Sequence, residues 1–222
     1  MRMTRVKVCC IRSVEEARLA VRLGASALGL VSEMPSGPGV IPEALIAEIA
    51  AAVPPRIGTF LLTSRADPAE IVAQQKRCRV HTIQICDRLR PGGLATLRAA
   101  LPGILLVQVI HVRDGASVAE AEDAAREADV LLLDSGNPSL PVKELGGTGR
   151  THDWTLSAEI VKKSRVPVFL AGGLNADNVG EAIRSVRPFG VDLCTGVRTD
   201  GALDEIKLAR FMSAVSVADK QG

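Results

Sequence analysis

Val168-Phe169-Leu170-Ala171-Gly172-Gly173 and Val191-Asp192-Leu193-Cys194-Thr195-Gly196 are two short apolar runs that each end in glycine. Two earlier runs, Lys7-Val8-Cys9-Cys10 and Leu131-Leu132-Leu133-Asp134, end instead on residues that can move a proton. Apolar runs of this length, bounded by turn residues, are typical of buried strands. Glycine loops and proton-transfer residues at the carboxyl ends of parallel strands are typical of the active-site end of a (β/α)8 barrel. The four runs therefore predict one site at one end of such a barrel.

Strand-like and helix-like segments alternate from one end of the chain to the other. The predicted strands span residues 6–11, 27–31, 57–62, 82–85, 104–111, 130–134, 167–171 and 191–195. Three of the predicted helices begin after the capping residues Ser13, Asp67 and Asn175. The other five span residues 42–52, 94–100, 118–128, 156–163 and 204–217. Eight such units in 222 residues favour an α/β fold with one closed (β/α)8 barrel domain, residues 1–222, over an open doubly wound sheet.

Helix-capping signals and glycine loops together indicate an anion site. Ser13 with Glu16 has the pattern of a capping box, and Asn175 is expected to cap the helix after Gly172-Gly173. A glycine loop that opens onto a helix N-terminus binds anions, because free amides and the helix dipole attract negative charge. Barrels often hold phosphate after strands seven and eight, so Gly172-Gly173 and Thr195-Gly196 predict a phosphate site.

The bulk composition limits the classes of protein that this chain can represent. Apolar residues make up 47% of the sequence and aromatic residues only 2%, which indicates a core of Ala, Val, Leu and Ile. The formal net charge of +2 is too small to indicate a nucleic acid or a membrane surface as a partner. No segment approaches the ~20 consecutive apolar residues that a membrane-spanning helix requires.

The cysteines and histidines show no metal-binding pattern. The cysteine count, five, is odd, no C-x-x-C spacing occurs, and the three histidines are widely separated, so we expect no metal and no cofactor. The N-terminal residues lead into a strand rather than an apolar signal region, which predicts a cytoplasmic protein with reduced thiols. The expected partner is a small phosphorylated molecule, and the sequence leaves a monomer and a homodimer equally open.

The first strand carries an unusual mixture of side chains. Because successive strand residues point to opposite faces, Lys7 and Cys9 are expected to face the barrel interior and Cys10 the helix layer. A buried lysine needs a partner, and the first and eighth strands are neighbours in a closed barrel. We therefore predict an ion pair between Lys7 and Asp192 below the site.

Several motifs, in order and spacing, resemble those of the phosphoribosylanthranilate isomerase family of tryptophan biosynthesis, a branch of amino-acid biosynthesis. The resemblance covers essentially the whole chain. The motifs are Lys7-Val8-Cys9-Cys10, Gln84-Ile85-Cys86-Asp87, Leu132-Leu133-Asp134, Gly146-Gly147-Thr148-Gly149-Arg150, Asp153-Trp154, Leu170-Ala171-Gly172-Gly173-Leu174-Asn175 and Thr195-Gly196-Val197.

The resemblance implies an Amadori rearrangement of an aminoaldose phosphate to an aminoketose phosphate. It implies that Asp134 is the acid that protonates the furanose ring oxygen and that Cys9 is the base that removes the C2′ proton. Burial raises a carboxyl pKa, and a thiol must be activated to act as a base, so both roles are chemically reasonable. Substrate-binding roles are expected for Arg12, Gln84, Gly172, Gly173, Asp192, Thr195 and Gly196. Residues 146–150, within the long segment 135–153, are expected to form a flexible lid.

The chain departs from the family pattern at the barrel mouth. Pro38 stands where the family has the arginine that holds the anthranilate carboxylate, and Arg12 is the candidate replacement. Cys10 and Cys86 replace a glycine and a histidine of the family. Two functions therefore remain open: an isomerase of phosphoribosylanthranilate or a related aminoaldose phosphate, and a phosphosugar-binding barrel with altered or lost chemistry and a regulatory role.

Overall fold

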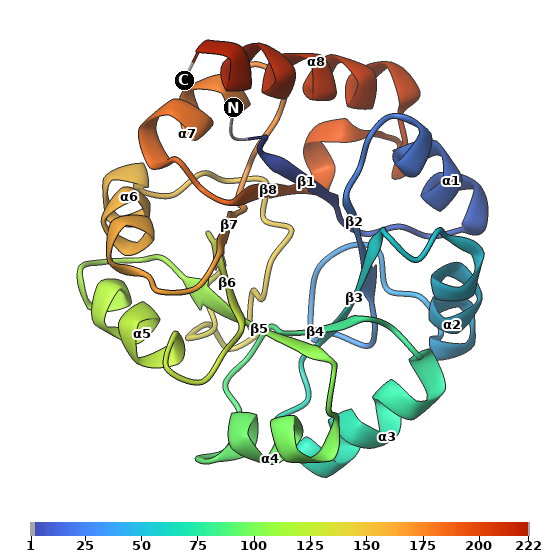
Figure 1. Ribbon diagram of the computed structural model, residues 1–222, viewed down its shortest axis with the longest axis vertical. Helices are drawn as coiled ribbons and strands as arrows, with labels where there is room; N and C mark the ends of the chain where they lie inside the picture. Colours follow the sequence, from blue (N-terminus) through green and yellow to red (C-terminus); the bar gives the residue numbers. More distant parts are fainter. Residues whose placement is uncertain (1–2, 222) are drawn as a thin grey trace.

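The computed structural model, which describes residues 3–221, contains a closed parallel barrel. Its strands follow one another around the barrel in chain order, and β8 closes the ring by pairing with β1. The strands are β1 (Arg5–Val8), β2 (Ala27–Val31), β3 (Gly58–Thr63), β4 (Thr82–Ile85), β5 (Leu105–His111), β6 (Val130–Asp134), β7 (Val168–Leu170) and β8 (Gly190–Leu193). Figure 1 shows these strands at the centre and the helices around them. The predicted (β/α)8 fold is confirmed.

Helices cover the outside of the barrel and alternate with the strands. They are α1 (Val14–Arg22), α2 (Glu43–Ala52), α3 (Pro68–Cys78), α4 (Gly93–Ala100), α5 (Ala116–Ala124), α6 (Trp154–Lys163), α7 (Val179–Val186) and α8 (Glu205–Gln221). After β8 come a 3₁₀ turn, η1 (Thr195–Val197), and a small antiparallel hairpin of β9 (Arg198–Thr199) and β10 (Ala202–Leu203), which the sequence pattern did not predict.

The predicted capping box at Ser13 is only half formed. The Ser13 side chain accepts a hydrogen bond from the Glu16 amide, at 3.2 Å, and so caps α1 as expected. The Glu16 carboxylate does not return to the Ser13 amide: it accepts from the Arg12 amide at 2.9 Å and pairs with Arg198. Glu16 therefore ties α1 to the loop after β8 rather than completing a local cap.

Asn175 does not cap a helix, contrary to the prediction. Its side-chain oxygen accepts hydrogen bonds from the amides of Asp177, at 2.8 Å, and Asn178, at 3.2 Å, and α7 begins only at Val179. Asparagine often bonds its own backbone two residues ahead in this way, which favours a turn over a helix start. The Gly172-Gly173 loop is consequently separated from the helix N-terminus by a turn.

Two apolar clusters hold the layers together. One lies between the strands and the helices and includes fully buried Leu28, Leu61 and Phe211. The other fills the barrel interior, where the rings of Phe60 and Phe169 meet edge to face with centroids 6.1 Å apart. This second cluster forms the floor beneath the open end of the barrel.

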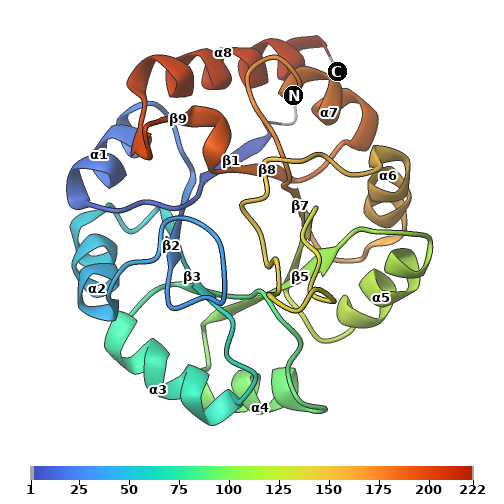
Figure 2. The same cartoon turned by 180° about the vertical axis from the view of Figure 1, so that it is seen from behind.

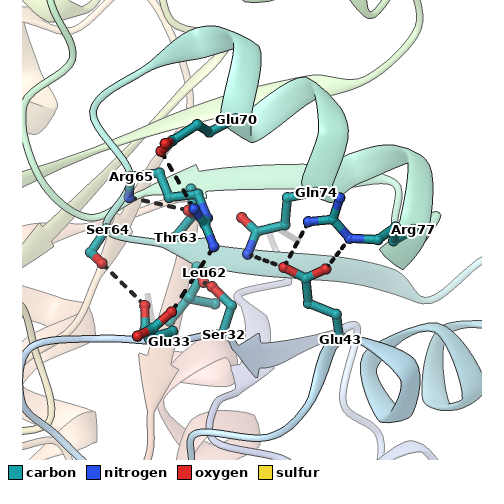
Figure 3. Close-up of polar contacts among 10 residues, drawn as sticks. All are labelled: Ser32, Glu33, Glu43, Leu62, Thr63, Ser64, Arg65, Glu70, Gln74 and Arg77. Atoms are coloured by element: carbon teal, nitrogen blue, oxygen red, sulfur yellow. Dashed lines mark hydrogen bonds and ion pairs between the residues drawn. The ribbon is translucent and has the colours of Figure 1, made fainter.

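Polar contacts connect the segments that follow β2 and β3 (Figure 3). Glu43, at the start of α2, accepts hydrogen bonds from Gln74, at 3.0 Å, and from Arg77 of α3. The Arg65 guanidinium lies between Glu33, at 4.0 Å, and Glu70, at 3.4 Å. Exposed ion pairs each contribute only about 0–1 kcal/mol, so these contacts mainly fix how neighbouring loops are placed.

Within residues 3–221, no helix has both the length and the apolar composition needed to cross a bilayer.

Candidate active site

A cavity opens at the carboxyl end of the barrel strands and collects most of the predicted site. The predicted residues that line it are Cys9, Gln84, Asp134, Gly172, Gly173, Asp192 and Thr195. Gly196 and Arg12 do not line it. A side chain at position 196 would lie 2.1 Å from the carbonyl oxygen of Leu174, so Gly196 is required by the close approach of two loops. Arg12 is exposed and donates to the Gly201 carbonyl at 3.2 Å.

Cys9 follows the last residue of β1 and is held by backbone contacts. Its amide donates to the carbonyl of Leu193 on β8, at 2.8 Å, and its side chain is buried. The thiol occupies space that Gly29 of β2 leaves free, because a Cβ at that position would lie 2.6 Å from the Cys9 sulfur. The absence of a side chain on the neighbouring strand therefore decides where this thiol sits.

Cys10 does not face the helix layer, contrary to the prediction, but lines the cavity beside Cys9. The alternation rule fails because β1 ends at Val8 and Cys10 adopts a left-handed conformation with φ +61°. Glycine adopts that conformation without steric cost. Cys10 thus has the left-handed backbone conformation that a glycine at this position would favour.

Asp134 is the last residue of β6 and is buried at the cavity wall. One carboxylate oxygen accepts from the Ser135 amide at 2.8 Å, and the other faces Gly146, where a Cβ would lie 2.8 Å away. Burial raises the pKa of Asp134 above its usual range, against smaller opposing effects of the Ser135 hydrogen bonds and of His111 and Lys7. The environment therefore favours the protonated carboxyl, as a general acid requires.

The predicted ion pair between Lys7 and Asp192 is confirmed at the cavity floor. The Lys7 Nζ donates to the Asp192 Oδ2 at 2.8 Å, and it lies 5.3 Å from the centroid of the Phe60 ring. Burial lowers the pKa of Lys7, but the charge of Asp192, assisted by Cys9, outweighs it, so that the net shift is upward. Lys7 is therefore a fixed positive charge directly below the Cys9 thiol.

Two buried oxygens at the floor have no hydrogen-bond partner within residues 3–221: the Gln84 Oε1 and the Asp192 Oδ1. Both residues line the cavity. Buried polar atoms are nearly always paired with protein, water or ligand. These two oxygens are therefore suited to accept hydrogen bonds from hydroxyl groups of a ligand.

The loops after β6, β7 and β8 pack against one another through their backbones. Gly172 and Gly173 have left-handed φ values of +88° and +62°. A Cβ at Gly173 would lie 2.7 Å from the Arg150 carbonyl carbon and 2.8 Å from the Thr151 amide nitrogen. These glycines are thus needed both for the turn and for the close approach of the preceding loop. Thr195, on the next loop, completes this side of the cavity.

The segment 135–153, here called the β6–α6 loop, lies over the barrel end together with the segment after β2 (Figure 2). The Ser36 hydroxyl donates to the Lys143 carbonyl at 2.6 Å, and the Ser135 and Thr148 hydroxyls bond at 2.7 Å. Leu145 is buried in the barrel cluster. Of the predicted lid, residues 146–150, residues 146–149 line the cavity and Arg150 does not. Thr148 is therefore a cavity residue that the sequence pattern did not single out.

Cationic side chains are absent from the cavity wall, as far as residues 3–221 are concerned. Pro38 lies at the wall, against Gly147. A second depression adjoins the cavity and shares Cys10, Pro38 and Thr195 with it; its other lining residues are Arg12, Gly39, Arg198 and Gly201. This side depression therefore places two arginines, Arg12 and Arg198, next to the cavity. Arg198 is ion-paired with Glu16 at 3.0 Å there, whereas Arg12 is exposed.

The part of the chain that the structure describes brings together no cluster of three or more His, Cys, Asp or Glu side chains suited to a metal ion. The predicted site thus contains an acid, a thiol and glycine loops within one cavity.

Comparisons with known proteins match the chain to isomerases both by sequence and by structure. Residues 6–214 match the family model for N-(5′-phosphoribosyl)anthranilate (PRA) isomerase. The N-(5′-phosphoribosyl)anthranilate isomerase of Methanocella arvoryzae is 33% identical over 216 residues, which are 97% of this chain and 99% of that protein. The crystal structure of the Thermotoga maritima phosphoribosylanthranilate isomerase superposes with a TM-score of 0.81 at 28% identity, covering 97% of this chain and all (100%) of that one.

A second solved isomerase structure contains a bound ligand. It is a complex with reduced 1-(o-carboxyphenylamino)-1-deoxyribulose 5-phosphate and has a TM-score of 0.79 at 26% identity, covering 97% of this chain and 100% of that chain.

Proposed function

The chain belongs to the phosphoribosylanthranilate isomerase family, and from this premise we propose that it converts N-(5′-phosphoribosyl)anthranilate into the corresponding 1-deoxyribulose 5-phosphate in tryptophan biosynthesis. The observation that carries the proposal is the cavity that holds Cys9 and Asp134 at the ends of β1 and β6, beside the glycine loops after β7 and β8. A base, an acid and an anion-binding loop at one end of a barrel are the parts that this reaction needs.

Asp134 is the general acid in this proposal. Its carboxyl group, whose pKa is raised by burial, gives its proton to the furanose ring oxygen. The bond between that oxygen and C1′ breaks, and the nitrogen lone pair of the anthranilate forms a carbon–nitrogen double bond to C1′. The product of this step is an open-chain iminium ion with a free hydroxyl group and an ionised Asp134.

Cys9 is the general base. Its thiolate removes the proton from C2′, the electrons of that bond form a C1′–C2′ double bond, and the positive charge on nitrogen is neutralised. The resulting enol becomes the ketone when C1′ takes up a proton and the C2′ hydroxyl group gives one up. The buried charge of Lys7, two residues before Cys9 in the sequence, interacts electrostatically with the Cys9 side chain.

The phosphate group binds to the loops after β7 and β8. Gly172, Gly173 and Thr195 line that side of the cavity, and the left-handed glycines orient successive backbone amides in the way that anion-binding nests do. The unpartnered oxygens of Gln84 and Asp192 accept hydrogen bonds from the sugar hydroxyls.

Because no cationic side chain lies on the described cavity wall, the anthranilate carboxylate must meet a cation from beyond that wall. Pro38 cannot supply one, and the side depression places the exposed Arg12 guanidinium within the same continuous surface. We assign the carboxylate to Arg12 because Arg198 is already engaged by Glu16. The absence of an arginine from the described cavity wall is also the observation that favours an alternative, a related aminoaldose phosphate with a different aglycone.

The direct test is conversion of N-(5′-phosphoribosyl)anthranilate by the purified full chain, with product identified by chromatography and mass, and with Asp134→Asn as the inactive control. Complementation of a tryptophan auxotroph that lacks this isomerase is the test in the cell. A folded wild type that binds inorganic phosphate but gives neither conversion nor growth would reject the activity. It would leave another aminoaldose phosphate or a phosphosugar-binding role as the function.

A further inference from the structure

The loop after β1, residues 9–13, carries the proposed base and has an irregular backbone. The strand ends at Val8, and Cys10 adopts a left-handed conformation with φ +61°. That conformation costs free energy in a residue with a side chain, so the surrounding contacts must hold it in place. The Cys10 side chain is tightly enclosed, since a Cβ at Gly39 would lie 2.5 Å from its own Cβ. A contact that fixes this backbone also fixes the direction of the neighbouring Cys9 thiol.

Arg198, on β9, makes such a contact with the loop after β1. Its side chain is only 7% exposed. The Nη2 donates to the carbonyl oxygen of Cys10 and, at 3.4 Å, to that of Cys9. The Nη1 donates to the carbonyl oxygen of Gly201 at 2.9 Å. One guanidinium therefore joins the two residues that follow β1 to the hairpin of β9 and β10.

Glu16, in the first turn of α1, holds this guanidinium in one orientation. Its Oε1 accepts from the Nη1 of Arg198 at 3.0 Å, and its Oε2 accepts from the Nη2 at 3.1 Å. The same carboxylate accepts from the amides of Arg12 and Leu203, each at 2.9 Å. Two parallel bonds between a guanidinium and a carboxylate are directional, so Glu16 sets the plane of the Arg198 guanidinium. Burial raises the pKa of Glu16, but the hydrogen bonds from Arg198 and the Leu203 amide outweigh it, so that the net shift is downward.

The hairpin that carries Arg198 is itself fastened to the chain that follows it. The Thr199 hydroxyl donates to the Asp204 carboxylate at 2.7 Å, just before α8. The Nζ of Lys207, within α8, donates to the carbonyl oxygen of Arg198 at 2.8 Å. Figure 2 shows β9 beside α1, the helix that carries Glu16. The guanidinium is therefore held both by its ion pair and through its own backbone.

We propose that Arg198, oriented by Glu16, is a positioning residue of the isomerase: it holds the turn after β1 so that the Cys9 thiol stays aimed at the C2′ proton. Arg198 does not line the main cavity, so it acts through the carbonyl groups of Cys9 and Cys10 rather than on the substrate. A base must stay within hydrogen-bond reach of the proton it removes, and a displacement of about 1 Å can lower the rate by about a hundredfold. The effect on turnover rests on the proposed function, whereas the fixing of the turn does not.

Replacement of the arginine by lysine keeps the charge and removes the planar fork. In Arg198→Lys the ammonium still faces Glu16, but one nitrogen cannot reproduce the bonds to the carboxylate and to the carbonyl groups. We expect kcat for N-(5′-phosphoribosyl)anthranilate to fall by roughly tenfold or more, while KM changes less and inorganic phosphate binds as in the wild type.

Arg77→Lys is the matched control, because Arg77 also makes paired hydrogen bonds with a glutamate, Glu43, but does so between α2 and α3. This variant should keep the wild-type kcat. A wild-type kcat in Arg198→Lys would overturn the proposal. A higher KM with unchanged kcat would also overturn it, because Arg198 would then be a substrate-binding residue.

A glycine at position 10 tests whether Arg198 acts through the turn. Glycine adopts the left-handed conformation without steric cost, so the Cys10→Gly enzyme should depend less on Arg198. The fall in kcat on adding Arg198→Lys to Cys10→Gly should therefore be smaller than the fall on adding it to the wild type. Equal falls would overturn the proposal. Circular dichroism and thermal unfolding of each variant check that a lower rate does not come from a lost fold.

Alkylation of Cys9 by iodoacetamide reports on the turn without any substrate. Cys9 is buried, so it should react faster in Arg198→Lys than in the wild type as the turn loosens. Fragmentation of the tryptic peptide of residues 8–12 locates the label, and Cys78, buried at the end of α3, is the reference that should react equally in both proteins. Unchanged reactivity of Cys9 would overturn the proposal. Faster alkylation in a protein without isomerase activity would uphold the fixing of the turn and reject only the proposed function.

Discussion

The two sides of the barrel mouth are built on different principles. On the side of the loops after β6, β7 and β8, here called the phosphate side, backbone lies against backbone, and Gly173 and Gly196 leave no room for a side chain. On the side of the loops after β1 and β2, here called the aglycone side, Cys10 and Pro38 stand where the family has glycine and arginine. A loop that binds a ligand through its backbone must keep its glycines. A contact made by a side chain, such as the one proposed for Arg12, can instead be supplied from a neighbouring loop.

Because the two sides differ in this way, we expect that one substitution can abolish turnover without weakening phosphate binding. Asp134→Asn keeps the size of the side chain but has no proton to give, so turnover should fall by about 10²–10⁴-fold. Affinity for inorganic phosphate, measured by thermal protection, should change little because the substitution alters neither the size of the side chain at the end of β6 nor the glycine loops after β7 and β8. Lost affinity with surviving turnover would make Asp134 a binding residue.

Cys9→Ser should also abolish most turnover while preserving the fold. The hydroxyl fits beside Gly29 but is a much weaker base than a thiolate, so the rate should fall by about a hundredfold or more. Steady-state kinetics and circular dichroism on the same preparation provide the check. A wild-type rate in a sample that mass spectrometry shows to be fully substituted would remove Cys9 from the mechanism.

A negative charge on the phosphate side should weaken the binding of ligands that carry phosphate. Thr195→Asp places a negative charge at the cavity wall and should weaken binding of inorganic phosphate by roughly ten- to a hundredfold, the value of about 1.5–3 kcal/mol for a contact with a charged group. Thr195→Asn is the matched neutral control and should bind nearly as the wild type does. Equal binding by both variants would place the phosphate elsewhere.

Removing or adding an arginine on the aglycone side should change the catalytic efficiency. Arg12→Ala should lower kcat/KM for N-(5′-phosphoribosyl)anthranilate by roughly tenfold, while inorganic phosphate binding stays unchanged. Pro38→Arg, which restores the family's residue, should recover part of the loss when combined with Arg12→Ala. Unchanged kinetics in Arg12→Ala would keep the activity but require another partner for the carboxylate.

The pH dependence of turnover should report the protonation state of Asp134, the proposed acid. Because burial raises the pKa of Asp134, the protonated and active form persists to a higher pH than that of an ordinary aspartate. Turnover should therefore fall as pH rises through this raised pKa, by up to about tenfold per pH unit. A rate of turnover that stays level on the alkaline side would contradict the assignment of Asp134 as the acid.

The regular parts of this structure follow from local signals in the sequence. Apolar runs predicted the eight barrel strands, because a strand covered on both faces must be continuously apolar. The pair of Lys7 with Asp192 followed from alternation along two strands that closure of the barrel makes neighbours.

The errors lie where regular structure ends. Alternation placed Cys10 in the helix layer, but the strand stops at Val8 and the backbone turns left-handed. Asn175 bonds to its own turn instead of capping α7. The substrate-binding role of Arg12 stays a prediction, but its position depends on a non-local contact with Gly201 in the hairpin of β9 and β10, an element that no pattern indicated. Side chains on loops depend on such distant contacts, which a single sequence does not reveal.

The contact of Gly173 with residues 150–151 also has a consequence for the timing of catalysis. The stem of the β6–α6 loop rests on the turn where the phosphate is proposed to bind, so neither can shift while the other stays still. A substrate that arrives by its phosphate end would clamp this stem before its sugar reaches Asp134. The product would leave only when the same stem loosens, so opening of this loop would be a step of every catalytic cycle.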